Sequence, residues 1–361
     1  MPLRVERRPE LARTLALASP LLALILTVAS GFVLFLAMGY DPAASLRAFF
    51  VSPVSSVYGL AELGVKATPL VLIAIGLALG FRANVWNIGA EGQLTIGAIA
   101  GGGIALAAWG AEGAWTLPAM IVAAMAGGAA WAAIPAFLRN RFGVNEILVS
   151  LMLTYVATLL LSTLVYGPWK DPAGFNFPQS RMFGDAAILP TILPGTRLHA
   201  GAMITLFAVG AAWLLIERGL MGFRIKVVGQ APAAARYAGF DARRVVWFCF
   251  LASGALAGLA GLFEVAGPIG QLVPTISPGY GFTAIIVAFL GRLHPLGILL
   301  AGLVLALSFI GGENAQIEVG LPQAVTGVFQ GLLLFFLLGC DVLIRYRLRW
   351  LPARRVLAAP A

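Results

Sequence analysis

Long apolar runs occupy most of the chain and are separated by short polar connections. One run, at residues 279–291, has only 13 residues, too few to cross a hydrocarbon core of about 30 Å as a helix. We expect it to be re-entrant or to form one half of a broken helix. The other runs have 16 to 25 residues, close to or above the length of about 20 residues that a membrane-spanning helix needs. The ten runs are Leu15–Met38, Leu63–Gly80, Gln93–Trp109, Ala114–Leu138, Ile147–Tyr166, Ala200–Ile216, Val245–Gly267, Gly279–Gly291, Leu296–Gly311 and Leu321–Ile344.

This pattern predicts an all-α polytopic membrane protein with about ten transmembrane or re-entrant helices. The composition agrees, because 60% of the residues are hydrophobic and only 11% are charged, whereas soluble domains carry roughly 25% charged residues. The first run is longer than the apolar core of a signal peptide, roughly 7–15 residues, and indicates an uncleaved first helix. We assign residues 1–14 to an N-terminal segment, 15–344 to a membrane domain and 345–361 to a basic tail.

The basic residues determine the expected orientation. The chain has 24 Lys and Arg, 15 Asp and Glu and a formal net charge of +9. With the N-terminus in the cytoplasm, 19 of the basic residues fall on the cytoplasmic side and five outside. Cytoplasmic loops carry the excess of Lys and Arg in membrane proteins. Both termini are therefore predicted to be cytoplasmic, and the positive charge needs no nucleic acid partner.

Two connections are long enough to have a structure of their own. The external loop 167–199 contains five prolines, a density that argues against a helix and for a folded loop. The cytoplasmic loop 217–244 contains the sequence A-P-A-A-A-R-Y at Ala231–Tyr237. Proline at a helix start followed by alanines predicts a short helix there, and Gly239 can end it.

The segment Asn84–Gln93 is a polar break between two apolar runs. It reads N-V-W-N-I-G-A-E-G-Q. Polar side chains and non-helical backbone are tolerated at membrane depth only where they are buried in protein or line a wet cavity. One interpretation is a cytoplasmic turn, and the other is an element of a solute path or inner gate. Glu91 could instead cap a helix N-terminus, where a carboxylate is stabilised by the helix dipole.

A second break follows the short run in the other half of the chain, at Arg292–Pro295 with the sequence R-L-H-P. Interrupted hydrophobic segments in corresponding parts of two halves are typical of transporter cores. The sequence therefore suggests an internal duplication. The predicted topology places both breaks on the same side of the membrane, so we expect them to be partners.

Several kinds of chemistry have no support in the sequence. None of the three lysines follows glycine as an ATP-binding loop requires. Neither the two cysteines nor the two histidines have disulfide or metal-ligand spacing. Glu264 and Asp341 are isolated and are expected to be hydrogen-bonded groups near helix ends, not catalysts. The pair Asn145–Glu146 is expected to cap the fifth helix or, alternatively, to belong to an inner gate.

Four motifs in this order resemble those of permease subunits of bacterial ABC importers, in the superfamily of monosaccharide and branched-chain amino acid permeases. The chain is similar to the nucleoside-type branch. The motifs are F-R-A-N-V-W-N-I-G-A-E-G-Q within Phe81–Ala98, G-V-N-E-I at Gly143–Ile147, V-V-G-Q-A-P-A-A-A-R-Y-A-G at Val227–Gly239 and G-Y-G-F-T-A-I-I-V-A-F-L-G-R-L-H-P-L-G at Gly279–Gly297. The chain departs from the family at Thr154 and Ala231, where Asn is common, which puts a sugar-hydroxyl contact at Thr154 in doubt.

The resemblance implies a permease domain in the bacterial cytoplasmic membrane and several partners. These are ATP-binding cassette ATPase subunits, which hold ATP and Mg²⁺, a second permease subunit of a different sequence and an external substrate-binding lipoprotein. The chain itself is expected to hold no cofactor or metal and to catalyse no covalent reaction. The short cytoplasmic helix near 230–241 would couple it to the ATPase. The coupling residues are Gly229, Gln230, Pro232, Ala234, Ala235, Arg236 and Gly239.

The sequence thus predicts import of a nucleoside or a related purine or sugar-like solute. The hypothesis for the solute path comprises Asn84, Trp86, Asn87, Glu91, Gln93 and Phe282. Two alternatives stay open: an ion-coupled secondary transporter with repeated broken helices, and a membrane-embedded enzyme, against which the missing catalytic groups argue.

Overall fold

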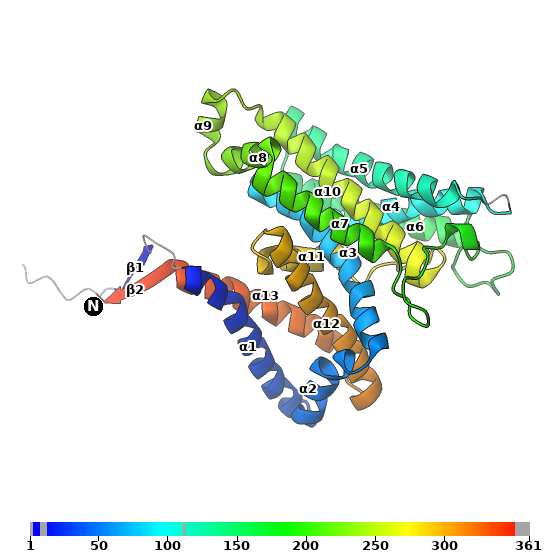
Figure 1. Cartoon of the computed structure of the whole chain (residues 1–361), viewed down its shortest axis with the longest axis horizontal. Helices are drawn as coiled ribbons and strands as arrows, with labels where there is room; N and C mark the ends of the chain where they lie inside the picture. Colours follow the sequence, from blue (N-terminus) through cyan, green and yellow to red (C-terminus); the bar gives the residue numbers. More distant parts are fainter. Residues whose placement is uncertain (1–2, 8–12, 111–112, 351–361) are drawn as a thin grey trace, which may run out of the picture. The chain divides into compact units, whose positions relative to one another are not determined.

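The computed structural model describes residues 3–7, 13–110 and 113–350. Within them the chain divides into two compact units, one formed by residues 52–311 and the other by residues from the two ends of the chain. Each of the ten apolar runs coincides with a helix, so the predicted all-α fold is confirmed (Figure 1). Six of the described helices are long and apolar enough to cross a membrane. The basic residues Arg8, Arg354 and Arg355 of the predicted terminal segments lie outside the described residues.

The unit formed by the chain ends is built around two long helices. Stacked phenylalanines form its core, with Phe329 lying 4.6 Å from Phe49 and 5.5 Å from Phe35 between ring centroids. The short helix α2 was not among the predicted elements, and Asp41 caps its first turn. The elements are β1 (Leu3–Arg7), α1 (Arg13–Ala37), α2 (Pro42–Phe50), the end of α12 (Pro295–Val319), α13 (Ala324–Arg345) and β2 (Tyr346–Trp350), and β1 pairs antiparallel with β2.

The larger unit, residues 52–311, holds all the predicted site residues. Its helical elements are η1 (Ser52–Val54), α3 (Val57–Arg82), α4 (Ala90–Ala107), α5 (Thr116–Phe142), α6 (Glu146–Tyr166), η2 (Asp185–Ala187), α7 (Gly201–Trp213), η3 (Leu214–Arg218), α8 (Leu220–Gln230), α9 (Pro232–Tyr237), α10 (Ala242–Glu264), η4 (Val265–Ile269), α11 (Tyr280–Leu290) and the greater part of α12. The π-helical turns η3 and η4 continue α7 and α10. Nearly every residue of α3 from Ala61 to Phe81 is buried, which marks this uniformly apolar helix as the central one.

Small residues let α4, α5 and α10 pack with their backbones in contact. A Cβ added to Gly97 would meet the Cα of Gly258 at 2.1 Å, and one added to Gly128 would meet the carbonyl oxygen of Gly254 at 2.1 Å. Small residues commonly permit such close approach between helices in membrane proteins. Gly327 of α13 has no such role, since a Cβ added there would meet nothing within 4 Å.

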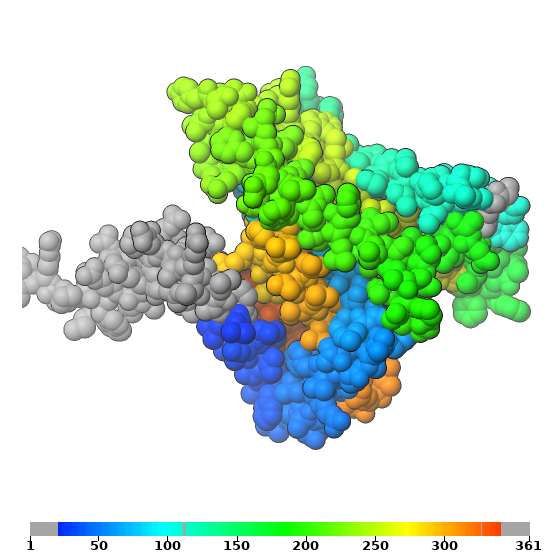
Figure 2. Space-filling model, in the orientation of Figure 1, coloured from blue at the N-terminus to red at the C-terminus, as the bar shows by residue number. Residues whose placement is uncertain are grey.

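The two long loops of this unit lie at opposite ends of its helices (Figure 1). The loop 167–199 is folded without long helices, as predicted, and packs on η4 through a hydrogen bond from Leu189 N to Ala266 O at 2.8 Å. The segment α8–α9 lies at the other end, where it stands out from the helices (Figure 2). The predicted short helix is α9, with Pro232 in its first turn, and Gly239 follows its end with a φ of +73°.

Candidate functional site

The polar residues 83–89 form a turn between α3 and α4. Asn84 adopts a φ of 56°, a left-handed conformation in which Asn is enriched. Its Oδ1 accepts a hydrogen bond from the Trp86 indole at 3.1 Å. The indole also stacks on Phe81 and Phe289, with ring centroids 5.0 and 6.0 Å away. The break is therefore a defined structure with its own contacts.

Asn87 and Gln93 form a reciprocal amide pair. Asn87 Nδ2 donates to Gln93 Oε1 at 2.8 Å, and Gln93 Nε2 donates to Asn87 Oδ1 at 3.0 Å. Asn87 also donates to Ser253 Oγ of α10 at 3.0 Å and accepts from Gly89 N at 3.2 Å. The two amides are 2% and 1% exposed, and a buried unpaired amide costs about 1–3 kcal/mol. In this conformation the two amides bond to each other and to neighbouring groups of the protein.

The Glu91 carboxylate joins the beginnings of α4 and α11. It lies in the first turn of α4, and its Oε2 accepts a hydrogen bond from Gly281 N, at the start of α11, at 2.6 Å. A Cβ on Gly281 would meet Glu91 N at 2.3 Å, so glycine is needed for the two helix ends to approach this closely. A carboxylate is favoured beside helix N-termini. Glu91 thus caps a helix, which confirms that reading of the sequence.

The second break, residues 291–294, lies directly against the first. Arg292 and Leu293 both have positive φ, 53° and 58°, and this turn exposes the Leu293 carbonyl to Arg82. Arg82 Nε donates to that carbonyl at 3.0 Å. On the same side, Phe289 stacks on Phe81 at 5.1 Å. The expectation that the two breaks are partners is confirmed by these contacts.

The pair Asn145–Glu146 has two distinct roles. Asn145 caps α6, because its Oδ1 accepts from Ile147 N at 2.9 Å. Glu146 pairs with Arg139 of α5 and accepts a 3.4 Å hydrogen bond from Trp86 N. The predicted cap is confirmed for Asn145. Glu146 connects α5 and α6 to the first break.

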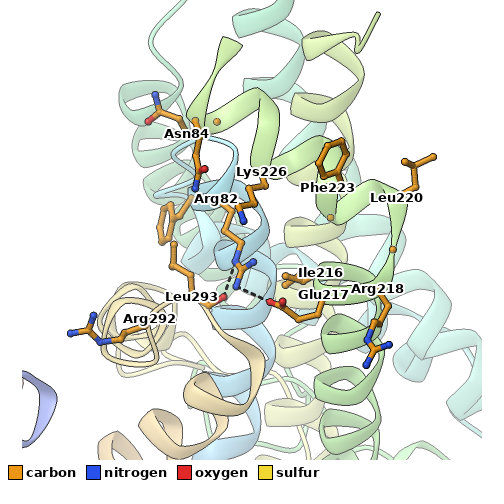
Figure 3. Close-up of a pocket in the computed structure, with 15 residues that line it drawn as sticks. Arg82, Asn84, Ile216, Glu217, Arg218, Leu220, Phe223, Lys226, Arg292 and Leu293 are labelled. Atoms are coloured by element: carbon orange, nitrogen blue, oxygen red, sulfur yellow. Dashed lines mark hydrogen bonds and ion pairs between the residues drawn. The ribbon is translucent and has the colours of Figure 1, made fainter. Parts of the chain in front are cut away.

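A cavity of about 970 Å³ opens where the two breaks meet the α7–α8 connection. Arg82 lies in the middle of it and reaches Glu217 Oε1 with Nη2 at 3.4 Å (Figure 3). Lys226 lies beside Arg82, and Arg218 and Arg292 lie at its edges. The lining residues are Phe81, Arg82, Asn84, Ile216, Glu217, Arg218, Gly219, Leu220, Gly222, Phe223, Lys226, Gly229, Gln230, Arg292 and Leu293. Residues of the first break, the second break and the predicted coupling segment thus share one cavity, which we call the inner cavity.

The segment α8–α9 is fixed at one end and exposed at the other. A Cβ on Gly229 would meet the Arg82 carbonyl oxygen at 2.1 Å, so α8 packs tightly on the end of α3. Ala235 is buried, whereas Ala234 and Arg236 are exposed. Tyr237 is 94% exposed. A short helix with one anchored and one solvent-facing side is suited to bind a partner protein.

The opposite end of the unit contains a second group of polar contacts. Arg197 of the loop 167–199 donates to both oxygens of Glu62, at 2.9 and 2.5 Å. His199 packs against Phe263, and its Nδ1 accepts from Gly201 N at 3.2 Å. Burial lowers the pKa of His199 to about 4, so this histidine is neutral at pH 7. Glu264, isolated in the sequence, accepts from Tyr280 Oη at 3.5 Å.

The structure groups the predicted residues differently from the sequence. Of the predicted path residues, Asn84 lines the inner cavity, Phe282 is 41% exposed on α11, and the others belong to the networks described above. Of the predicted coupling residues, Gly229 and Gln230 line the cavity. The ion pair between Arg82 and Glu217 was not predicted, because the two residues are 135 positions apart in the sequence. Only the basic character of the predicted cytoplasmic side pointed to this cluster.

Comparison with known proteins gives consistent matches along the chain. The family described as branched-chain amino acid transport system, permease component, matches residues 59–338. The glucose ABC transporter permease protein TsgB13 of Haloferax volcanii is 39% identical over 99% of this chain and 97% of its own. The guanosine ABC transporter permease protein NupP of Bacillus subtilis is 32% identical over 88% of this chain and 91% of its own.

A solved structure supports the fold independently. It is an inward-facing metal-chelate type ABC transporter, with a TM-score of 0.50 and 16% identity, and the match covers 91% of this chain and 99% of the other. At this identity the likeness concerns the helical architecture.

Proposed function

The chain belongs to the permease family of branched-chain amino acid transport systems and is an ABC transporter permease of the sugar and nucleoside importer group; from this membership we propose that it moves a nucleoside inward across the bacterial cytoplasmic membrane. Proteins of this group are integral membrane transport components, not enzymes. The family implies ATPase partners and a second permease subunit. Membership of this family gives no support to an ion-coupled mechanism.

The observation that carries the proposal is the inner cavity, where the broken helices meet the α8–α9 segment. Gly229 packs on the end of α3 beside Arg82, and Arg82 in turn contacts Leu293 after α11. A displacement of α9 by a bound partner would therefore be transmitted through α8 to both breaks. ATP and Mg²⁺ would be held by the partner ATPase, and closure of its subunits would provide that displacement. An assembly with two states can be biased in this way by a partner that prefers one of them.

The solute has two candidates. The motifs resemble the nucleoside-type branch, and NupP carries guanosine in its name. A sugar is favoured by the higher identity to TsgB13, named as a glucose permease. Both are neutral solutes with a hydroxylated ring. An external binding protein would deliver either solute to the end of the unit that carries the loop 167–199.

Reconstitution tests the proposal. The permease is combined in proteoliposomes with its ATPase, second permease and binding protein, and uptake of labelled guanosine and glucose is measured. We expect ATP-dependent uptake of one of these two solutes, and guanosine is the one that we favour. Uptake that persists without the ATPase and collapses with an ionophore would overturn the ABC mechanism in favour of an ion-coupled one.

The coupling role is tested with Ala234→Trp on the exposed side of α9, and Ala114→Trp, at another exposed alanine remote from α9, is the matched control. We expect the Ala234 variant to fold and to hydrolyse ATP while uptake falls strongly, and the control to transport normally. Normal uptake by the Ala234 variant would rule out docking through this side of α9.

A further inference from the structure

The lining of the inner cavity contains more positively than negatively charged side chains. Its lining includes four cationic side chains and one anionic side chain, Glu217. The formal net charge of the lining is thus +3. Cavities lined by charge of one sign concentrate ligands of the opposite sign. A volume of about 970 Å³ is at the upper end of the range for small-molecule sites, roughly 300–1,000 Å³.

The one ion pair inside the cavity is weak. Arg82 reaches Glu217 by a single contact of 3.4 Å, and the two side chains are 23% and 39% exposed. Such partly exposed pairs contribute about 0–1 kcal/mol. The stronger bond of Arg82 uses Nε, which donates to the Leu293 carbonyl at 3.0 Å. The terminal nitrogens of the guanidinium are therefore available to a better acceptor than Glu217.

Lys226 is the second cation at the centre of the cavity. It lies on α8 next to Arg82 of α3 (Figure 3). In the part of the chain that the structure describes, Lys226 forms no ion pair. Lys226 is an exposed residue, and an uncharged amide, Gln230, lies one helical turn further along α8. Two cations from different helices thus face one space.

We propose that the inner cavity binds a phosphate-bearing group, with Arg82 and Lys226 as its ligands and Arg218 and Arg292 adding to the attraction at the edges. A phosphomonoester carries more charge than the Glu217 carboxylate and offers three oxygens to the two cations, and the phosphodiester of a lipid headgroup offers two oxygens and a single charge. Charge-assisted hydrogen bonds from Arg and Lys to phosphate are among the strongest in proteins. The bound phosphate displaces Glu217 from Arg82, and Glu217 turns to solvent.

Binding has a structural consequence for the transporter. The phosphate links Arg82 on α3 to Lys226 on α8, which replaces one weak contact with a bridge of several strong ones. Because α8 leads into α9, the bridge holds the α8–α9 segment against the end of α3. The ligand therefore stiffens, from the predicted cytoplasmic side, the connection through which a movement of α9 reaches the two breaks. This inference goes beyond import and depends only on the predicted orientation, not on the identity of the imported solute.

The phosphate could come from a soluble phosphomonoester or from the headgroup of an anionic lipid. The purified complex of permeases and ATPase is titrated by calorimetry with ribose 5-phosphate, and ribose is the neutral control. The complex is held in nanodiscs of phosphatidylcholine or of phosphatidylglycerol. Ribose 5-phosphate has no nucleotide base, so it avoids the ATP sites of the ATPase. Weaker binding of ribose 5-phosphate in phosphatidylglycerol than in phosphatidylcholine identifies a lipid headgroup as the occupant. Equal binding in the two kinds of nanodisc identifies a soluble ligand.

Two substitutions have opposite expected effects. Lys226→Gln removes a charged ligand and should weaken binding of ribose 5-phosphate by about tenfold or more. Glu217→Gln removes the competitor for Arg82 and should strengthen binding by up to about fivefold. Arg243→Gln, which removes one positive charge from the exposed start of α10 outside the cavity, should change neither value.

Several results would overturn the proposal. The first is no heat of binding for the wild-type complex in phosphatidylcholine nanodiscs. Equal weakening by Lys226→Gln and Arg243→Gln would show non-specific charge attraction. Loss of the ATPase from the Lys226→Gln complex during purification, without ribose 5-phosphate binding in the wild type, would mean that the cavity binds an acidic side chain of the ATPase. The import proposal is unaffected by these outcomes, because uptake is measured separately.

Discussion

The amide pair Asn87–Gln93 can be tested by a double-mutant cycle with the apolar substitutions Asn87→Leu and Gln93→Met. Asn87→Leu leaves both ends of the buried Gln93 amide without partners, and a buried unpaired amide costs about 1–3 kcal/mol. Adding Gln93→Met removes that amide, so the second substitution should cost almost nothing in the first background. Gln93→Met alone loses the two hydrogen bonds of 2.8 and 3.0 Å and leaves Asn87 bonded to Ser253 and Gly89. The expected coupling free energy is about 1–3 kcal/mol.

The assay is the free energy of unfolding of the purified permease in mixed micelles titrated with sodium dodecyl sulfate, read by tryptophan fluorescence. Effects of the two substitutions that add within about 0.5 kcal/mol would refute the pairing. Uptake by the double variant decides between two interpretations of the break. Uptake per folded molecule close to that of the wild type would mean that the pair is structural. A large loss with receptor affinity unchanged would place the amides on the solute path.

Three further outcomes are expected. The pKa of His199 is about 4 in the folded protein and about 6.5 in the unfolded chain, so the unfolded chain takes up the proton first as pH falls. The free energy of unfolding should therefore fall by about 3 kcal/mol between pH 6.5 and 4. Thermal unfolding of the His199→Gln variant should lack that part of the pH dependence. Gly229→Val should disrupt packing of α8 on α3 and abolish uptake, whereas Gly327→Val, where a Cβ meets nothing within 4 Å, should be tolerated; equal expression and uptake by both variants would contradict the close approach. A cysteine at Gly184 should react with an impermeant maleimide in intact cells and one at Gln230 only after permeabilisation, against a low background because Cys249 and Cys340 are buried; the reverse pattern would invert the topology.

Hydrophobic runs predicted the helices well because a membrane helix satisfies all of its backbone hydrogen bonds within one segment. Each of the ten runs is therefore a local signal, and each coincides with a helix. The α9 helix was predicted for a similar reason, since proline at its start and glycine after its end are local signals. The short helix α2, in contrast, has no long apolar run and was not predicted.

The site was only partly predictable. Glu91 could be named as a helix cap because a carboxylate suits any helix N-terminus, but the sequence does not say which helix it caps. The answer, α11, depends on Gly281, which is 190 positions away. Likewise Asn87 stands out as an amide in an apolar region, yet its bond to Ser253 spans 166 positions.

By itself the sequence determined the helices, their expected orientation and the resemblance to ABC permeases, because these follow from local hydrophobicity, charge and motifs. Only the tertiary structure decided that the two breaks touch each other and share a cavity with the start of the coupling segment. Close packing of helices, made possible at Gly229 and Gly281, brings those residues together. The pairing of Arg82 with Glu217 also follows from that packing, because it depends on which distant side chain reaches the guanidinium.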